Sequence, residues 1–143
     1  TIHRKGITLQ PSKKGSVASC CLFSNFMDYL AYLSLSKDGK IALPKECDCI
    51  ILNHHFNLSH FLVESEEYEE VNLFLPNSSA GKVLTRTIMD RNPAAVDWSG
   101  SYIHFQSLRS YAYYKFIKTK RAYENSGNSI RCCRHWHHHR LHL

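Results

Sequence analysis

The segment from Gln106 to Tyr123 carries the clearest periodic pattern in the chain, and it limits the fold more than any other feature. Five apolar residues fall within one arc when successive residues are placed 100° apart: Phe105, Leu108, Ala112, Phe116 and Tyr123. We therefore predict a helix over about 106–123 whose apolar arc faces the protein core. The turn-forming residues 125–128 end it.

The rest of the chain has to supply the other layers of that core. Short apolar runs bounded by turn residues predict strands over 49–52, 58–63, 71–75 and 102–105. Residues 82–89 fit a helix or a strand, because alternating and helical spacings coexist there. Three- and four-residue spacing predicts an earlier amphipathic helix through Leu22, Phe23, Phe26, Met27, Leu30 and Leu33.

These elements together predict an α+β fold. It consists of a small mixed or antiparallel sheet with an N-terminal helix and a C-terminal basic helix, flanked by basic arms. We divide the chain into a basic, extended N-terminal arm (1–19), a single α+β domain (20–125) and a Cys/His/Arg-rich tail (126–143). No apolar run approaches the roughly 18–20 residues that a membrane helix needs, so we predict no transmembrane segment.

Charge is distributed unevenly along the chain, whose formal net charge is +6. Residues 20–72 hold three lysines and nine carboxylates, whereas residues 99–143 hold eight cations and one carboxylate. The N-terminal arm adds further cations. Two basic ends around an acidic middle favour a polyanionic partner or an acidic protein surface. The alternative is that the two halves neutralise each other within one fold.

The predicted C-terminal helix interleaves rings with cations on the side opposite its apolar arc. Phosphate backbones need spaced cations and unpaired bases stack on rings, while protein interfaces favour Tyr and Arg at their centres. We therefore predict a non-catalytic binding subunit of a larger complex that docks onto nucleic-acid phosphate or an acidic protein. The predicted contact residues are Arg109, Tyr111, Tyr114, Lys115, Lys118, Lys120, Arg121, Arg131, Arg134, Trp136 and Arg140.

Metal binding is an alternative function, because thiols and imidazoles crowd the last twelve residues. His135 and His139 stand four apart, and Cys132 or Cys133 would add a third ligand for zinc or copper. The adjacent cysteines depart from the two-to-four-residue spacing that tetrahedral zinc sites use. A second candidate cluster combines two groups of residues: Cys47 and Cys49 with His54, His55 and His60.

A further alternative function is catalysis, because the sequence contains two similar histidine segments. His54/His55-Phe56-Asn57 and His104-Phe105-Gln106 resemble the paired motifs of the two-histidine phosphoesterases. The resemblance implies that the two histidines act as acid and base on a phosphodiester. Asn57 and Gln106 stand where that family has Ser or Thr, and the chain holds no other catalytic signature.

The cysteines also bear on the compartment. Two of the three pairs are adjacent in sequence and cannot easily bridge internally, so we predict free thiols in a reducing, intracellular compartment. A secreted, disulfide-bonded protein is the alternative. An even number of six cysteines and two glycosylation sequons, at 57–59 and 77–79, are compatible with it.

Overall fold

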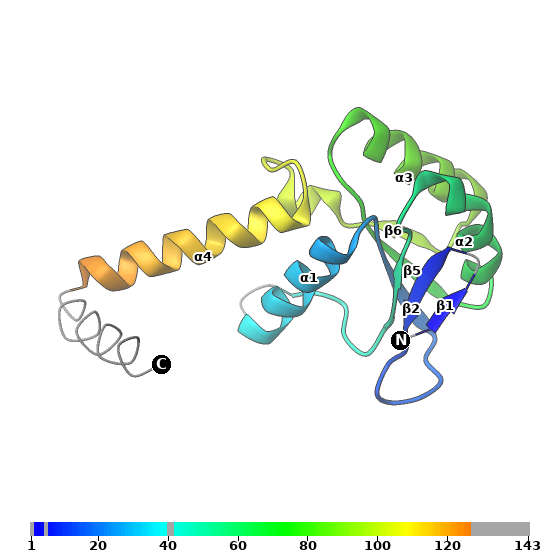
Figure 1. The fold of residues 1–143 in the computed structure, drawn as a ribbon, viewed down its shortest axis with the longest axis horizontal. Helices are drawn as coiled ribbons and strands as arrows, with labels where there is room; N and C mark the ends of the chain where they lie inside the picture. Colours follow the sequence, from blue (N-terminus) through cyan, green and yellow to red (C-terminus); the bar gives the residue numbers. More distant parts are fainter. Residues whose placement is uncertain (1, 5, 40–41, 127–143) are drawn as a thin grey trace. The chain divides into compact units, whose positions relative to one another are not determined.

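The computed structural model describes residues 2–4, 6–39 and 42–126 (Figure 1). The chain divides into two compact units between Ala112 and Tyr113. The first unit contains the sheet and most of the helices, and the second contains the greater part of the last helix.

The sheet is mixed, with strands in the order β1-β2-β4-β3-β5-β6. Strands β3, β4, β5 and β6 run parallel, and the antiparallel hairpin of β1 and β2 extends the sheet beyond β4. The strands are β1 (Ile2–Arg4), β2 (Ile7–Gln10), β3 (Ser19–Phe23), β4 (Asp48–Ile51), β5 (Glu70–Phe74) and β6 (Ala95–Asp97). The predicted α+β class with a small mixed sheet is therefore confirmed.

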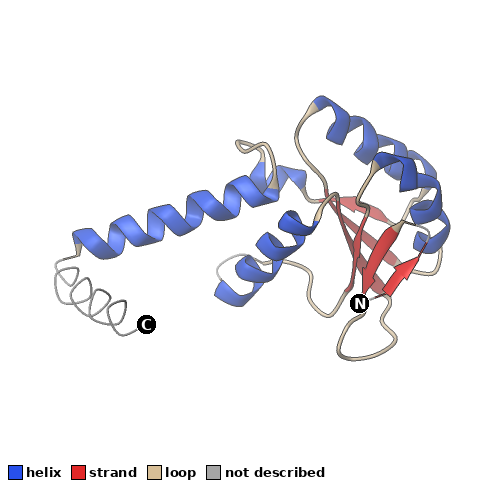
Figure 2. Cartoon of the chain, in the orientation of Figure 1, coloured by secondary structure: helices blue, strands red, loops and turns tan. Residues whose placement is uncertain are grey.

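Helices cover both faces of this sheet (Figure 2). The helical elements are α1 (Phe26–Asp38), η1 (His55–Asn57), α2 (Leu58–Ser65), α3 (Ser79–Arg91), η2 (Ser99–Tyr102) and α4 (Leu108–Asn125). On one face, Phe23 and Phe74 pack with Tyr32 and Leu35 of α1 and with Leu108. On the other, the strands pack against α2 and α3, a core that includes Leu22, Ile50, Phe61, Leu73 and Ile88.

The predicted first helix is wrong at its beginning, because residues up to Phe23 belong to β3. All four residues from Cys20 to Phe23 are fully buried. A central parallel strand is covered on both faces, so it needs a continuous apolar run and not an alternating one. Helix α1 begins only after Asn25, whose side chain accepts the backbone N–H of Asp28 at its N-terminus.

That shift also reverses the side of α1 that faces the core. The α1 side chains that were predicted to face the core are exposed by 37–56%: Phe26, Met27, Leu30 and Leu33. The buried side consists of Asp28, Ala31, Tyr32 and Leu35. The prediction set the phase of the helix from Leu22 and Phe23, which are strand residues, so the phase was wrong.

Some of the other predicted elements are confirmed, and others are wrong. The strands predicted at 49–52 and 71–75 correspond to β4 and β5, and the helix predicted at 106–123 corresponds to α4. Residues 58–63 form helix α2 and not a strand, because Leu58, Phe61 and Leu62 at helical spacing pack on the sheet. Residues 82–89 lie in α3, and 102–105 form 3-10 and turn structure instead of a strand.

The predicted extended arm contributes to the sheet. Within it, Thr8, Leu9 and Gln10 pair with Ile51, Ile50 and Cys49 of β4. Ile7 is only 2% exposed and lies in the core under α2 and α3. Burial of apolar side chains on one strand face therefore holds this segment on β4, which the basic composition of residues 1–19 had obscured.

Candidate interaction surface on helix α4

The point where strand order reverses is the usual ligand crevice of parallel sheets, and in this protein another segment of the chain lies across it. The reversal falls between β3 and β5, at their carboxyl ends. Asn77, after β5, donates its side-chain amide to the carbonyls of Tyr102 and Phe105 at 3.0 and 2.8 Å. Asp28, in α1 after β3, accepts the backbone N–H of Arg109 at 3.0 Å. Residues 102–109 thus connect Asn77, which follows β5, with Asp28 in the helix that follows β3.

The histidines predicted as an acid–base pair come from distant parts of the sheet. His54 and His55 follow β4, whereas His104 follows β6, and β3 and β5 lie between these strands. Three strand spacings amount to about 14 Å. His54 accepts the N–H of Phe56 with its Nδ1, and its ring packs 4.2 Å from that of His55. The strand order therefore separates the two predicted histidine segments by two strands, and their acid–base pairing stays a prediction.

The second predicted metal cluster is likewise divided between the two ends of one strand. Cys47 and Cys49 lie at the amino end of β4, and His54, His55 and His60 follow its carboxyl end. Among the described residues, no group of three or more His, Cys, Asp or Glu is placed to hold a metal ion. The tail ligands Cys132, Cys133, His135 and His139 lie outside the described residues.

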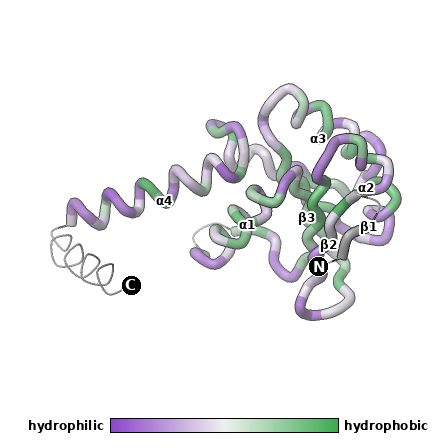
Figure 3. The backbone as a smooth tube through the Cα atoms, in the orientation of Figure 1, coloured by the Kyte–Doolittle hydropathy of each residue, from purple (hydrophilic) through white to green (hydrophobic). Residues whose placement is uncertain are grey.

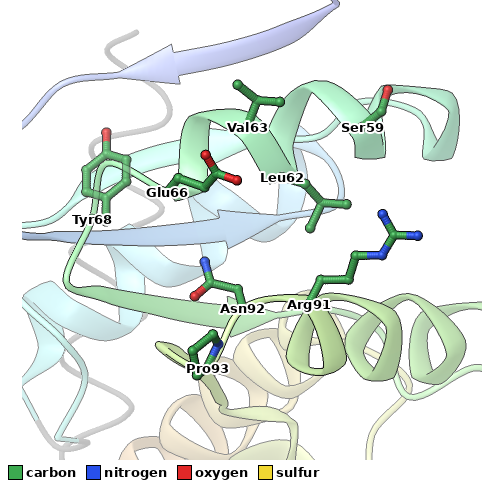
Figure 4. Close-up of a pocket in the computed structure, with 8 residues that line it drawn as sticks. All are labelled: Ser59, Leu62, Val63, Glu66, Tyr68, Arg91, Asn92 and Pro93. Carbon is green, nitrogen blue, oxygen red and sulfur yellow. The ribbon is translucent and has the colours of Figure 1, made fainter.

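A cavity of about 540 Å³ opens between α2 and the end of α3 (Figure 4). It is lined by Ser59, Leu62, Val63, Glu66, Tyr68, Arg91, Asn92 and Pro93. Two of its polar groups are engaged within the protein. The hydroxyl of Tyr68 donates to Asp48 at 2.7 Å, and the amide of Asn92 donates to Ser65 at 3.1 Å. Ser59, Glu66 and Arg91 make up the rest of its polar lining.

The first turn of α4 is held on the core of the first unit. The Ser107 hydroxyl accepts the N–H of Ser110 at 3.3 Å and caps the helix, and Leu108 is only 2% exposed. Tyr111 and Ala112 pack against the same core. Of the predicted contact residues, Tyr111 is therefore half-buried, while the side chain of Arg109 is exposed.

The buried carboxylate of Asp28 helps to fix that turn. It accepts the N–H of Arg109 and a hydrogen bond from Ser24, at 3.0 and 3.3 Å. Burial raises the pKa of this carboxyl group, although the Arg109 N–H and the Ser24 hydroxyl act in the opposite direction.

Beyond Ala112, helix α4 exposes aromatic and basic side chains in the second unit. The exposed fractions are 68% for Tyr113, 47% for Tyr114, 66% for Phe116 and 48% for Tyr123. Lys118, Lys120 and Arg121 are also exposed, and Lys115 is half-buried. Figure 3 shows most of this helix as hydrophilic, interrupted by hydrophobic positions. We call residues 113–125 the exposed α4 segment.

The sequence-based prediction was wrong for two members of this segment and left out a third. Phe116 and Tyr123 were predicted to face the core and are exposed, and Tyr113 was not predicted as a contact residue at all. At 100° per residue, Tyr113, Phe116, Lys120 and Tyr123 share an arc of roughly 80°. Spacing reveals this face, but it does not reveal whether the protein's own core covers it. The predicted contacts Arg131, Arg134, Trp136 and Arg140 lie outside the described residues.

Both sequon asparagines use their amide nitrogens within the fold. Asn57 donates to the carbonyl of Leu52 at 2.9 Å, and Asn77 donates to Tyr102 and Phe105. A glycan on either nitrogen would replace one of its two N–H groups and so remove at least one of its hydrogen bonds. Among the residues that the structure describes, no helix is both long and apolar enough to cross a membrane.

Similarity to known proteins gives no guide to the function of this chain. No protein-family model matches the chain, and neither the curated proteins nor the solved structures contain a detectable match.

Proposed function

We propose that this chain is a non-catalytic binding subunit whose exposed α4 segment docks into an apolar, acid-rimmed groove on a protein partner. The observation that carries the proposal is the exposure of Tyr113 and Phe116, each by about two thirds, on a helix rich in cations. Helices that bind in grooves present anchors at three-, four- and seven-residue spacing. The rings of Tyr113, Phe116 and Tyr123 follow one another at steps of three and seven residues.

The rings would supply the affinity. Fully burying a Phe side chain contributes about 1.5–3 kcal/mol, and aromatic residues dominate interface hot spots. Phe116 has no polar group that water can hydrate, so its exposure costs more than that of the tyrosines. A partner groove that buries Phe116 together with Tyr113 would remove most of this cost.

The cations would supply steering and selectivity for an acidic partner. Helix α4 carries five cations, Arg109, Lys115, Lys118, Lys120 and Arg121, against the single acid Glu124. Relative to Phe116, Lys120, Arg121 and Lys118 project at roughly 40°, 140° and 200° around the axis. Cations that encircle a helix fit a groove with acidic walls better than a single phosphate backbone, which favours a protein over a nucleic acid. Complementary charge chiefly accelerates association.

A site-specific photo-crosslinker tests this proposal. A benzophenone side chain replaces Tyr113 in the full chain expressed in its source cells, and the matched control carries it at Val63, which is 66% exposed on α2. We expect a discrete protein adduct from position 113 alone. Its mass spectrum should identify a partner with an acidic surface.

Purified partner then permits a quantitative test. Phe116→Ala should weaken binding by tenfold or more, as truncation of a central aromatic anchor does, whereas Val63→Ala should leave the affinity unchanged. Lys118→Ala with Arg121→Ala should slow association and reduce its dependence on salt. A nuclease-sensitive adduct would show a nucleic-acid partner instead, and equal adducts from positions 113 and 63 would refute a dedicated α4 surface.

A further inference from the structure

The cavity between α2 and the end of α3 has a negative charge towards one end and a positive charge towards the other. Figure 4 shows the Glu66 carboxylate on the Tyr68 side of Leu62 and the Arg91 guanidinium on its Ser59 side. In the part of the chain that the structure describes, neither of these charged groups has a hydrogen bond or an ion pair. Both are therefore available to a ligand that carries the opposite charges.

We propose that this cavity binds a short apolar peptide with free termini, whose ammonium group pairs with Glu66 and whose terminal carboxylate pairs with Arg91. All the lining residues belong to the first unit. The site is therefore separate from the exposed α4 segment and does not depend on the function proposed for that segment.

The length of the cavity suits a peptide of about three residues. Ser59, Leu62 and Glu66 are spaced by three and four residues, so they lie along one side of α2. The helix rises about 10 Å from Ser59 to Glu66. An extended peptide advances roughly 3.3–3.6 Å per residue, so about three residues cover that length. The volume of about 540 Å³ also lies within the range of about 300–1,000 Å³ that ligand pockets have.

The part of the cavity between the two charges is apolar. Leu62 is half-buried and lies between Glu66 and Arg91 in Figure 4, and Pro93 adds apolar surface from the side of α3. A free amino acid carries both of its charges on one carbon atom, whereas a peptide separates them by apolar side chains. The arrangement of charge, apolar surface and charge therefore favours a peptide over a single amino acid.

A hydrogen bond holds the two walls of the cavity together. The side-chain amide of Asn92, which follows α3, donates to the hydroxyl of the fully buried Ser65 near the end of α2 at 3.1 Å. Arg91 is the last residue of α3, and Glu66 directly follows α2. Each charged residue is thus next in sequence to one of the two residues that this hydrogen bond joins, so the fold places both charges before a ligand binds.

The two charges also set the direction of the bound peptide. The guanidinium of Arg91 matches a carboxylate with two parallel hydrogen bonds, and the carboxylate of Glu66 accepts hydrogen bonds from an ammonium group. The amino terminus of the peptide would therefore lie towards Tyr68 and its carboxyl terminus towards Ser59. Because Glu66 and Arg91 are exposed, water and salt screen both pairs, and each strengthens binding only moderately.

Nuclear magnetic resonance of the full chain tests the proposal. The ¹⁵N-labelled protein is titrated with the tripeptide Leu-Ala-Leu, and separately with its N-acetylated and its C-amidated forms. We expect saturable shifts of the backbone amides of residues 59–68 and 91–92 with the free tripeptide. Each capped form lacks one terminal charge and should bind about fivefold more weakly.

Variants assign each end of the peptide to its charge. Glu66→Gln should bind the free and the N-acetylated peptide equally and stay sensitive to amidation, whereas Arg91→Gln should show the opposite pattern. Glu67→Gln and Arg86→Gln, at exposed neighbours of the same two charges, are the matched controls and should keep the preferences of the wild type. A merely structural role of Glu66 or Arg91 would weaken all three peptides alike.

Three results would overturn the proposal. The first is a set of amide shifts in the cavity that does not change at millimolar tripeptide, and the second is equal affinity of the wild type for the free and the capped peptides. The third is an equal response to sodium acetate alone, because it would show that Arg91 attracts an adventitious anion only.

Discussion

Two stretches of the same helix differ sharply in what surrounds them. Leu108 and Phe116 both lie on the apolar arc of α4, two turns apart, yet Leu108 is 2% exposed and Phe116 is 66% exposed. Leu108 packs among Phe23, Phe74 and Tyr102 in the sheet core. Phe116 belongs to the second unit.

This difference shows that an apolar arc predicts a helix face that will be buried. It does not predict whether the core of the same protein or another molecule buries that face. In the first turn of α4, the core of the first unit covers that face. In the exposed α4 segment, the same pattern continues while its rings remain accessible. Monomeric proteins rarely expose clustered large apolar side chains without a use for them. The comparison therefore separates residues that stabilise this fold from residues available to another molecule.

The largest expected effect is the difference in stability loss between Leu108→Ala and Phe116→Ala. Leu108→Ala should lower the free energy of unfolding by about 2–5 kcal/mol, because it removes buried methyl groups and leaves a cavity. Phe116→Ala should change the stability of the isolated protein by no more than about 0.5 kcal/mol. Urea denaturation followed by circular dichroism measures both. Equal losses in the two variants would mean that the core of this protein covers Phe116, and the comparison would fail.

A pair of glycines extends the contrast from side chains to the backbone. A Cβ on Gly81, in the first turn of α3, would lie 2.1 Å from the carbonyl oxygen of Pro76, whereas one on Gly100 would meet nothing within 4 Å. Gly81→Ala should therefore destabilise the protein by about 1–3 kcal/mol despite the better helix propensity of alanine. Gly100→Ala should be neutral or stabilise it by up to about 1 kcal/mol. Thermal unfolding of the two variants side by side would refute this contrast if Gly81→Ala were as stable as the wild type.

Elements with one dominant local signal were predictable from the sequence. Val71 to Leu75, stopped by Pro76, predicted β5, and the long periodic segment predicted α4 to within two residues at each end. The mixed α+β class followed from these elements. Strand β6 was not predictable in this way, because its three residues include only one large apolar side chain, Val96, and pairing with β5 holds it.

The environment of each face was much less predictable, because it depends on tertiary neighbours. An apolar run such as Cys20 to Phe23 fits a buried strand or part of a helix equally well. Assigning it to a helix set the wrong phase for α1. The cations of α4 were evident from the sequence, whereas the exposure of Phe116 required the fold. The facing of Cys21 and Cys49 required the register of β3 against β4.

The smallest effect concerns the carboxylate that holds the first turn of α4. Asp28→Asn keeps an oxygen for the N–H of Arg109 and removes the ionisation. Burial raises the pKa of Asp28 in the folded protein, so the folded state binds this proton more tightly than the unfolded chain. The contribution of this carboxyl group to stability therefore falls as pH rises from the unfolded pKa of about 3.9 through the higher folded pKa.

Asn at position 28 does not ionise, so the Asp28→Asn variant does not lose this stability as pH rises. The free energy of unfolding of the variant minus that of the wild type should therefore increase with pH across this window. Below it, where Asp28 is protonated, the two proteins should agree within about 1 kcal/mol. Urea denaturation at a series of pH values measures the difference. Asp38→Asn, at an exposed carboxylate of the same helix, is the matched control and should follow the wild-type profile. A difference between Asp28→Asn and wild type that shrinks as pH rises would mean that hydrogen bonds from Arg109 and Ser24 outweigh burial. The carboxylate would then actively stabilise the first turn of α4.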